Sequence, residues 1–234
     1  MAIDILYIVG TGSKFDNREL LYSLRSLDKF GKNVGRVIIS GYCPDFIDKD
    51  KIVHVECEDI ATPSVNHWWK VKQAFKAAES NKVLLMYDDI FFCKDVDCEN
   101  YPYNYRVELP SEDKIAKWGH IQYLAKSWLS KHGLPTKHYG VHTPFIYERE
   151  KFEKLDKVFQ GFRAQGGVSV RSLYGNVYVT GATQRDDIKI FVDYWDMNQW
   201  VKDKECFSTA PDNFDKAPEK WLRENFEEKS RWEK

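Results

Sequence analysis

The sequence has few cysteines and no pattern that would pair them. Five cysteines are scattered along 234 residues, and an odd, widely spaced set does not form a disulfide framework. Cys93 and Cys98 are too far apart for a Cys-x-x-Cys motif, so a zinc site is not expected. These features favour a reducing compartment.

Long apolar runs and a strong net charge are also missing. The longest apolar stretches are far too short to span a bilayer, and residues 1–5 lack the basic start of a secretory leader. We therefore expect no transmembrane segment and a cytoplasmic protein, from a bacterium or a phage-infected cell. The net charge of −1 excludes a general attraction to nucleic acid but leaves room for a local basic groove.

The glycine-rich start lacks the two common phosphate-binding patterns. No Gly-Lys-Ser/Thr follows the run Val9-Gly10-Thr11-Gly12-Ser13, and no glycine stands three residues after Gly12. An ATPase and a dehydrogenase are thereby disfavoured. The run is either a tight strand-to-helix turn or a place where small residues let a nucleotide approach the backbone. In the second case Val9, Gly10 and Thr11 would contact the nucleotide.

Hydrophobic periodicity indicates an α/β protein. Apolar residues make up 43% and charged residues 30% of the chain, as in globular proteins. Strands are predicted at residues 3–9, 37–39, 52–55 and 82–87, and helices at about 17–30 and 65–80. This alternation predicts a mainly parallel, Rossmann-like central sheet with helices on both faces.

The second half of the chain is less regular. Helices are predicted at about 115–131, 148–159, 168–174 and 218–228, and strands at 141–147 and 188–192. An aromatic stretch at 101–105 is a loop or an edge strand. Because no repeat or long linker interrupts the chain, we expect a single domain of residues 1–234.

An acidic pair follows the most apolar strand. Residues 82–87 lead into Asp88 and Asp89, and two adjacent carboxylates are rarely buried without compensation. A divalent cation, which takes oxygen ligands, would compensate them, and the alternative is a solvated turn. Since ligands bind beyond the carboxyl ends of parallel strands, residues 10–13 and this pair should share one rim of the sheet.

Further polar residues are candidates for the same chemistry. His142 stands before Thr-Pro in an extended segment and could ligate a metal, bind a phosphate or be purely structural. Asp59 and Asn66 flank the entry to a predicted helix, where Asn66 could also be the cap. Asp193 follows a predicted strand and Asp212 lies in a polar turn, so either of them, or His142, could act as a base.

Residues 15–27 resemble the second conserved region of the Stealth proteins. They read Phe15-Asp16-Asn17-Arg18-Glu19-Leu20-Leu21-Tyr22-Ser23-Leu24-Arg25-Ser26-Leu27, against the family's R-F-x-D-N-x-E-L-R-Y-S-L-R-S. The similarity continues through 36–41, 44–46 and 54–60, and Asn66 falls where that region has an Asn-Ser pair. Residues 87–92, Tyr-Asp-Asp-Ile-Phe-Phe, resemble the third region's N-D-D-x-F-F. About the first 95 residues are covered well and the rest patchily.

Stealth proteins are sugar-phosphate transferases that use nucleotide sugars, and they are linked to glycosyltransferases of the GT-A fold. The resemblance implies a GT-A-like domain in which Asp88 and Asp89 contact a metal and the donor diphosphate. It places Asp16, Asn17 and Arg25 near the nucleotide sugar and makes His142 a metal ligand or a phosphate contact. Together with Val9, Gly10, Thr11, Asp59 and Asn66, these residues form the predicted donor site.

The chain departs from the family pattern at its start and at the acidic pair. Residues 3–10 lack the Trp and the second Asp of the family's I-D-x-V-Y-T-W-V-D-G, and Tyr87 replaces the first residue of N-D-D. These departures favour plain glycosyl transfer. We therefore expect a glycosyltransferase that uses Mn²⁺ or Mg²⁺ and a nucleotide-diphosphate sugar, most simply a UDP-sugar, with Asp89, Asp193 and Asp212 as catalytic candidates.

The acceptor is expected to be a hydroxyl group of a glycan or of a hydroxymethylated DNA base. Residues 1–95 would bind the nucleotide sugar and residues 96–234 the acceptor. Two other functions stay open at this point: a Stealth-like sugar-1-phosphate transferase, and a sugar-binding module without catalytic activity that uses its eight tryptophans and thirteen tyrosines.

Overall fold

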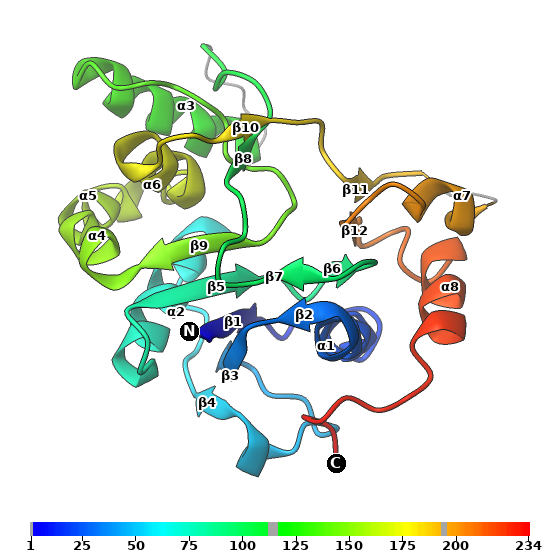
Figure 1. The fold of residues 1–234 in the computed structure, drawn as a ribbon. Coiled ribbons are helices and arrows are strands. Elements are labelled where there is room, and N and C mark those ends of the chain that lie inside the picture. Colours follow the sequence, from blue (N-terminus) through cyan, green and yellow to red (C-terminus); the bar gives the residue numbers. More distant parts are fainter. Residues whose placement is uncertain (1, 112–116, 193–195) are drawn as a thin grey trace.

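A mixed central sheet organises the protein (Figure 1). The computed structural model describes residues 2–111, 117–192 and 196–234. The sheet has the order β4-β3-β1-β5-β9, formed by β4 (Val53–Val55), β3 (Val34–Gly41), β1 (Ile3–Val9), β5 (Lys82–Met86) and β9 (Phe145–Glu148). Neighbours from β4 to β5 pair in parallel, and β9 pairs antiparallel to β5. The predicted α/β class and mainly parallel sheet are confirmed.

Both faces of this sheet are covered by apolar side chains. In β1, Ile5, Tyr7 and Val9 pack with Leu24 of α1 (Arg18–Phe30) in one buried cluster. Leu6 points to the other face and packs with residues of α2 (Pro63–Ala77). The apolar side chains of β5 are fully buried because the strand lies between these two layers.

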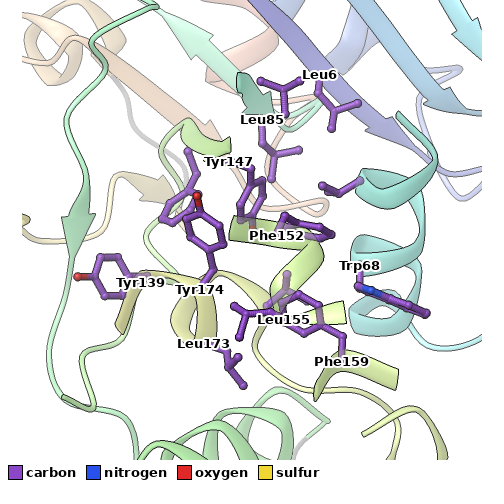
Figure 2. Packing of buried hydrophobic residues seen from close by; sticks show 14 of the residues in the cluster. Leu6, Trp68, Leu85, Tyr139, Tyr147, Phe152, Leu155, Phe159, Leu173 and Tyr174 are labelled. Carbon is purple, nitrogen blue, oxygen red and sulfur yellow. The ribbon is translucent and has the colours of Figure 1, made fainter. Parts of the chain in front are cut away.

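The layer on the α2 side is unusually aromatic. Figure 2 shows Leu6 and Leu85 from the sheet near Tyr147 and Phe152, with Trp68 of α2 in the same cluster. The rings of Tyr147 and Phe152 meet edge to face with centroids 5.1 Å apart. Much of the aromatic content of this chain is therefore core.

The remaining helices belong to the second half. They are α3 (Lys117–Lys131), α4 (Arg149–Lys154), α5 (Asp156–Gly161), α6 (Val170–Tyr178), α7 (Met197–Val201) and α8 (Ala217–Asn225). The single helix predicted at 148–159 is wrong, because the backbone of Leu155, at φ −89° and ψ −3°, separates α4 from α5. The helix predicted at 168–174 begins later and extends to Tyr178.

Short strands extend the fold beyond the central sheet. A small sheet has the order β11-β12-β6, from β11 (Lys189–Ile190), β12 (Cys206–Thr209) and β6 (Ile90–Phe92). Further pairs are β2 (Gly31–Lys32) with β7 (Val96–Asp97), and β8 (Asn104–Tyr105) with β10 (Thr183–Gln184). Single 3₁₀ turns lie at Lys49–Lys51 and Arg163–Gln165. The predicted strands at 141–147 and 188–192 are shorter than expected.

The chain end is fastened to α1. Arg25 donates Nε and Nη2 to the two carboxylate oxygens of Glu233 at 2.9 and 2.8 Å, and Nη1 to the carbonyl of Phe226 at 2.9 Å. The amide of Asp48 bonds to the carbonyl of Trp232. Among the described residues, no helix has the length and apolar character needed to cross a membrane.

Candidate functional site

The strand order creates a switch point between β1 and β5. The chain passes from β1 through α1 to β3 and β4 on one side, and then through α2 to β5 on the other side of β1. In open α/β sheets, ligands bind in the crevice beyond the carboxyl ends of strands at such a point. This crevice is where a site should be sought.

A pocket of about 510 Å³ occupies that position. It is lined by Gly10, Gly12, Ser13, Lys14, Glu19, Asp88, Asp89, Thr209, Pro211, Asp212 and Phe214. The glycine-rich turn after β1 and the acidic pair after β5 therefore share one rim, as predicted. The loop after β12 forms the opposite wall, so both halves of the chain contribute to the pocket. It is called the donor pocket below because it overlaps the predicted donor site.

Three carboxylates in the donor pocket repel one another. Asp88 is partly buried, and burial, with the charges of Asp89 and Glu19, raises its pKa to about 7. The ammonium of Lys189 acts in the opposite direction but does not cancel the effect. With Asp212, four carboxylates line the pocket, and among the described residues the lysines that pair with them are Lys14 and Lys189, so carboxylates are in excess.

Asp89 is held by contacts from the small second sheet. Its Oδ2 accepts from Lys189 Nζ and from Ser208 Oγ, both at 2.9 Å. Its carbonyl accepts the amide of Thr209 at 3.3 Å. Both side-chain contacts fall on Oδ2, so β11 and β12 fix the orientation of this carboxylate.

Glu19 is a site residue that sequence reasoning missed. It lies in the first turn of α1, is buried, and accepts from Ser13 Oγ at 2.9 Å. Burial raises its pKa. The same Ser13 Oγ accepts the amides of Phe15 and Asn17 and so shapes the turn. The place of Glu19 in the first turn of α1 gave no signal of a site, because acidic residues are common at helix N-termini.

A buried lysine, Lys70, links the end of β1 to Asp59 next to Gly10. Lys70 Nζ of α2 donates to the carbonyl of Val9 at 2.6 Å and pairs with Asp59 Oδ1 at 2.6 Å. The other oxygen of Asp59 lies 3.5 Å from where a Gly10 Cβ would be. The structure thus brings Val9, Gly10 and Asp59 together at one edge of the donor pocket.

Other residues of the predicted donor site are exposed on the surface or bind backbone groups nearby. Thr11 and Asp16 are exposed, and Asn17 precedes α1 in a left-handed conformation at φ 58° without capping it through its side chain. Asn66 does not cap α2 either; Thr62 does. Asn66 Oδ1 instead accepts the amides of residues 60 and 61 at 2.8 and 3.0 Å.

Arg25 and His142 are not among the residues that line the donor pocket. Arg25 is engaged by the chain end, as described above. His142 Nδ1 lies 2.9 Å from both carboxylate oxygens of Asp187, which also pairs with Arg106 at 3.2 Å. The pKa of Asp187 falls to about 2, because the bonds and charges of His142 and Arg106 outweigh its burial.

Of the two aspartates predicted as bases in the second half, one reaches the donor pocket. Asp212 lines it, is 83% exposed in its side chain and pairs with Lys14 at 2.9 Å. That hydrogen bond lowers the pKa of Asp212, which makes it a weaker proton acceptor. Asp193 lies outside the described residues.

A chain of three hydrogen-bonded side chains, Tyr87, His67 and Tyr147, begins next to the acidic pair. Tyr87 Oη lies 3.0 Å from His67 Nδ1, and His67 Nε2 lies 3.1 Å from Tyr147 Oη. Burial and the charge of Arg171 lower the pKa of His67 to about 3, so the ring is neutral. Through His67, Tyr87 therefore ties the end of β5 to α2 and to Tyr147 of β9.

The carboxylates of the pocket fit a divalent cation whose coordination is completed by substrate oxygens. In the part of the chain that the structure describes, no three His, Cys, Asp or Glu side chains converge as a complete metal site. Mg²⁺, however, is usually held by one or two carboxylates together with substrate phosphates. Asp88 and Asp89 both line the 510 Å³ pocket and match that pattern, with Lys189 already paired with one oxygen of Asp89.

Comparisons with known proteins do not add to this geometry. A scan against protein-family models finds no match to the chain. A search of curated proteins finds no significant match. The resemblance to the Stealth proteins therefore stays a prediction.

Proposed function

We propose that this protein is a glycosyltransferase of GT-A-like fold that transfers a sugar from a nucleotide-diphosphate sugar to an acceptor hydroxyl. The observation that carries the proposal is the donor pocket itself. It lies at the switch point of the sheet, its volume of about 510 Å³ is in the range of small-molecule sites, and it contains an acidic pair in which Lys189 pairs with Asp89 while burial and neighbouring carboxylates raise the pKa of Asp88.

A divalent cation, Mn²⁺ or Mg²⁺, would be held by Asp88 and Asp89 with the donor diphosphate. When bound, such a cation stabilises the negative charge of the leaving diphosphate. Lys189 and Ser208 hold the Asp89 carboxylate in one orientation, which prepares it before the donor binds. The small residues Gly10 and Gly12 allow the donor to approach the backbone at the end of β1.

The transfer has a simple balance of bonds. The bond between the anomeric carbon and the diphosphate oxygen breaks, and the acceptor oxygen forms the new glycosidic bond. The acceptor proton passes to a base, and the nucleoside diphosphate leaves. Among the described residues, Glu19 and Asp212 line the pocket and could take that proton, and Glu19 is the stronger base because its pKa is raised while that of Asp212 is lowered.

The test is an assay of donor cleavage with a panel of nucleotide sugars and Mn²⁺ or Mg²⁺. We expect release of nucleoside diphosphate, and we expect Asp88→Asn to lower the rate by about a hundredfold or more. Asp203→Asn is the matched control, because Asp203 is exposed and does not line the donor pocket. Its rate should equal that of the unaltered protein.

The products distinguish the competing functions. Release of nucleoside monophosphate would replace this proposal with sugar-1-phosphate transfer. If no nucleotide sugar is cleaved and none binds at the donor pocket, the proposal is wrong. If Asp88→Asn and Asp203→Asn behave alike, the role given to the acidic pair is wrong.

A further inference from the structure

A second pocket of about 250 Å³ opens between α2 and α3. It is lined by Thr62, Ser64, Trp118, His120, Ile121, Gln165 and Gly166. Thr62 and Ser64 come from the first half of the chain and the other lining residues from the second. The pocket thus lies between residues of the first half of the chain, which carries the acidic pair, and residues of the second half.

Hydrogen bonds make the floor of this pocket rigid. Thr62 Oγ1 donates to the carbonyl of Gly166, and Ser64 Oγ donates to the carbonyl of Val168, both at 2.6 Å. Gly166 and Gly167 have φ of +84° and +96°, a conformation that lets the turn lie close against α2. The pocket is therefore formed before any ligand arrives.

One wall of the pocket is an open aromatic surface. Trp118 is 56% exposed, whereas Ile121, one turn further along α3, is buried. Large exposed aromatic side chains at a concave, preformed surface are typical of ligand-binding sites, because the ring offers apolar area and its N–H a polar contact. Gln165 is exposed on the opposite side and offers both a donor and an acceptor.

The lining residues that the structure describes include no Lys, Arg, Asp or Glu. Nucleic-acid grooves combine aromatic stacking with positive charge along the backbone, and phosphate ligands need donors of positive charge. A neutral ligand with one apolar face and several hydroxyl groups fits better. At about 250 Å³ the pocket is below the 300–1,000 Å³ range of larger small-molecule sites, which suits a single sugar ring.

The second pocket begins close to the edge of the donor pocket. α2 follows the parallel strand β4, so its first turn lies on the same rim of the sheet as the acidic pair. Asp59, at the edge of the donor pocket, stands three residues before Thr62, a distance of at most about 11 Å along the chain. A ligand held here can extend toward the donor.

We propose that this second pocket is the acceptor subsite and that it binds a neutral sugar ring of a glycan on the indole of Trp118. The proposal rests on the proposed transferase function and gives that function a substrate class, because it selects the glycan over the hydroxymethylated DNA base. Thr62 and Ser64 present hydroxyl oxygens, and Gln165 presents an amide, to the hydroxyl groups of the ring.

The experiment measures acceptor binding separately from donor cleavage. Neutral disaccharides (maltose, lactose and N,N′-diacetylchitobiose) and a duplex with 5-hydroxymethylcytosine are offered to the protein, and binding is followed by saturation-transfer NMR. We expect a signal from at least one disaccharide and none from the DNA. Trp118→Ala should abolish the signal and Trp118→Phe should keep part of it. Trp128→Phe, ten residues further along the same helix, is the matched control and should keep all of it.

Kinetics then connect binding to transfer. With the disaccharide that binds, Trp118→Ala and Gln165→Ala should raise the acceptor KM tenfold or more. Neither should change the slow hydrolysis of the nucleotide sugar without acceptor, because neither residue lines the donor pocket. Gln165 is exposed, so Gln165→Ala tests the assignment even if the tryptophan variant folds poorly.

The outcomes separate this inference from the proposed function. If the donor is cleaved but both variants keep the unaltered acceptor KM, the acceptor subsite is wrong and the transferase stands. If the duplex is modified and no disaccharide binds, the choice of a glycan is wrong. If disaccharides bind at Trp118 but no nucleotide sugar is cleaved, the transferase is wrong, and the second pocket is a sugar site but not an acceptor subsite.

Discussion

The donor pocket and the second pocket lie on the same rim of one sheet, but they differ in charge. The first is lined by four carboxylates, Glu19, Asp88, Asp89 and Asp212, and lysines pair with two of them, Lys189 with Asp89 and Lys14 with Asp212. The second is lined by an indole, an imidazole, two hydroxyls and one side-chain amide, with no Lys, Arg, Asp or Glu among the described lining residues. The contrast suggests that the donor pocket binds an ionic ligand and the second pocket a neutral one.

The difference also lies in what each pocket needs to keep its shape. In the donor pocket, Lys189 and Ser208 bind a carboxylate that would otherwise repel its neighbour. In the second pocket, Thr62 and Ser64 bind backbone carbonyls of the 166–168 turn. Loss of a contact should therefore be far more costly in the donor pocket, because an unpaired buried charge is more expensive than a lost neutral hydrogen bond.

The largest expected effect comes from Lys189. Lys189→Met removes the cation that holds Asp89, and we expect donor cleavage to fall by about two to three orders of magnitude. Lys189→Arg should keep a substantial part of the activity. Lys202→Met is the matched control, since Lys202 is exposed and directly follows the next helix, α7. Equal rates for Lys189→Met and Lys202→Met would show that the donor pocket does not depend on this charge.

A smaller effect is expected from two glycines that support the two pockets. At Gly41, with φ +113°, a Cβ would lie 2.1 Å from the carbonyl oxygen of Val9, whereas at Gly167 it would lie 2.7 Å from the hydroxyl of Ser64. A backbone oxygen cannot move away as a side chain can. We expect Gly41→Ala to lower the free energy of unfolding by about 3 kcal/mol and Gly167→Ala by about 1–2 kcal/mol.

Urea unfolding measures this difference as a shift of the midpoint at constant slope. Gly12→Ala is the control, because a Cβ there meets no atom within 4 Å and φ is not in the left-handed range. Its midpoint should stay within experimental error of the unaltered protein. A larger loss at Gly167 than at Gly41 would contradict the ranking.

The smallest effect is a contribution of the donor pocket to the pH dependence of stability, and the partly buried His67 and His138, whose pKa values are lowered, contribute with the opposite sign. The folded-state pKa of Asp88 is about 7, above its ordinary value, so the folded protein binds a proton here more tightly than the unfolded chain. The stability from this proton is fully present below about pH 4 and is lost as the pH rises through about 7. Glu19, whose pKa is also raised, acts in the same direction.

The measurement is the free energy of unfolding between pH 4.5 and about 7.5, without divalent cations. Asp88→Asn should flatten the decline, whereas Gln165→Ala in the second pocket should leave it unchanged. Added Mn²⁺ should restore stability at the upper end of the range, because it binds the ionised pair. An identical decline in Asp88→Asn would assign the pH dependence to other groups.

Much of the candidate site was accessible to sequence reasoning because it follows strand ends. Gly10 and Asp88 were expected on one rim from the β-α-β pattern, and the structure confirms that they line one pocket. Arg25 shows the limit of motif transfer. It lies in the motif that resembles a donor-binding region, yet its guanidinium is bound by Glu233, 208 residues later in the sequence. Local spacing contains no information about a partner so distant.

The sequence by itself determined where the strands and the main helices form and that they build a layered α/β protein. The reason is that β-branched and apolar runs such as β1 and β5 must be buried on both faces, whatever else the chain does. Only the tertiary structure decided the charges and partners of the site. It paired Lys189 with Asp89, buried Glu19 beside them, and brought Trp118 to the turn at 166–168. These relations depend on how distant elements pack, and packing is a property of the whole fold.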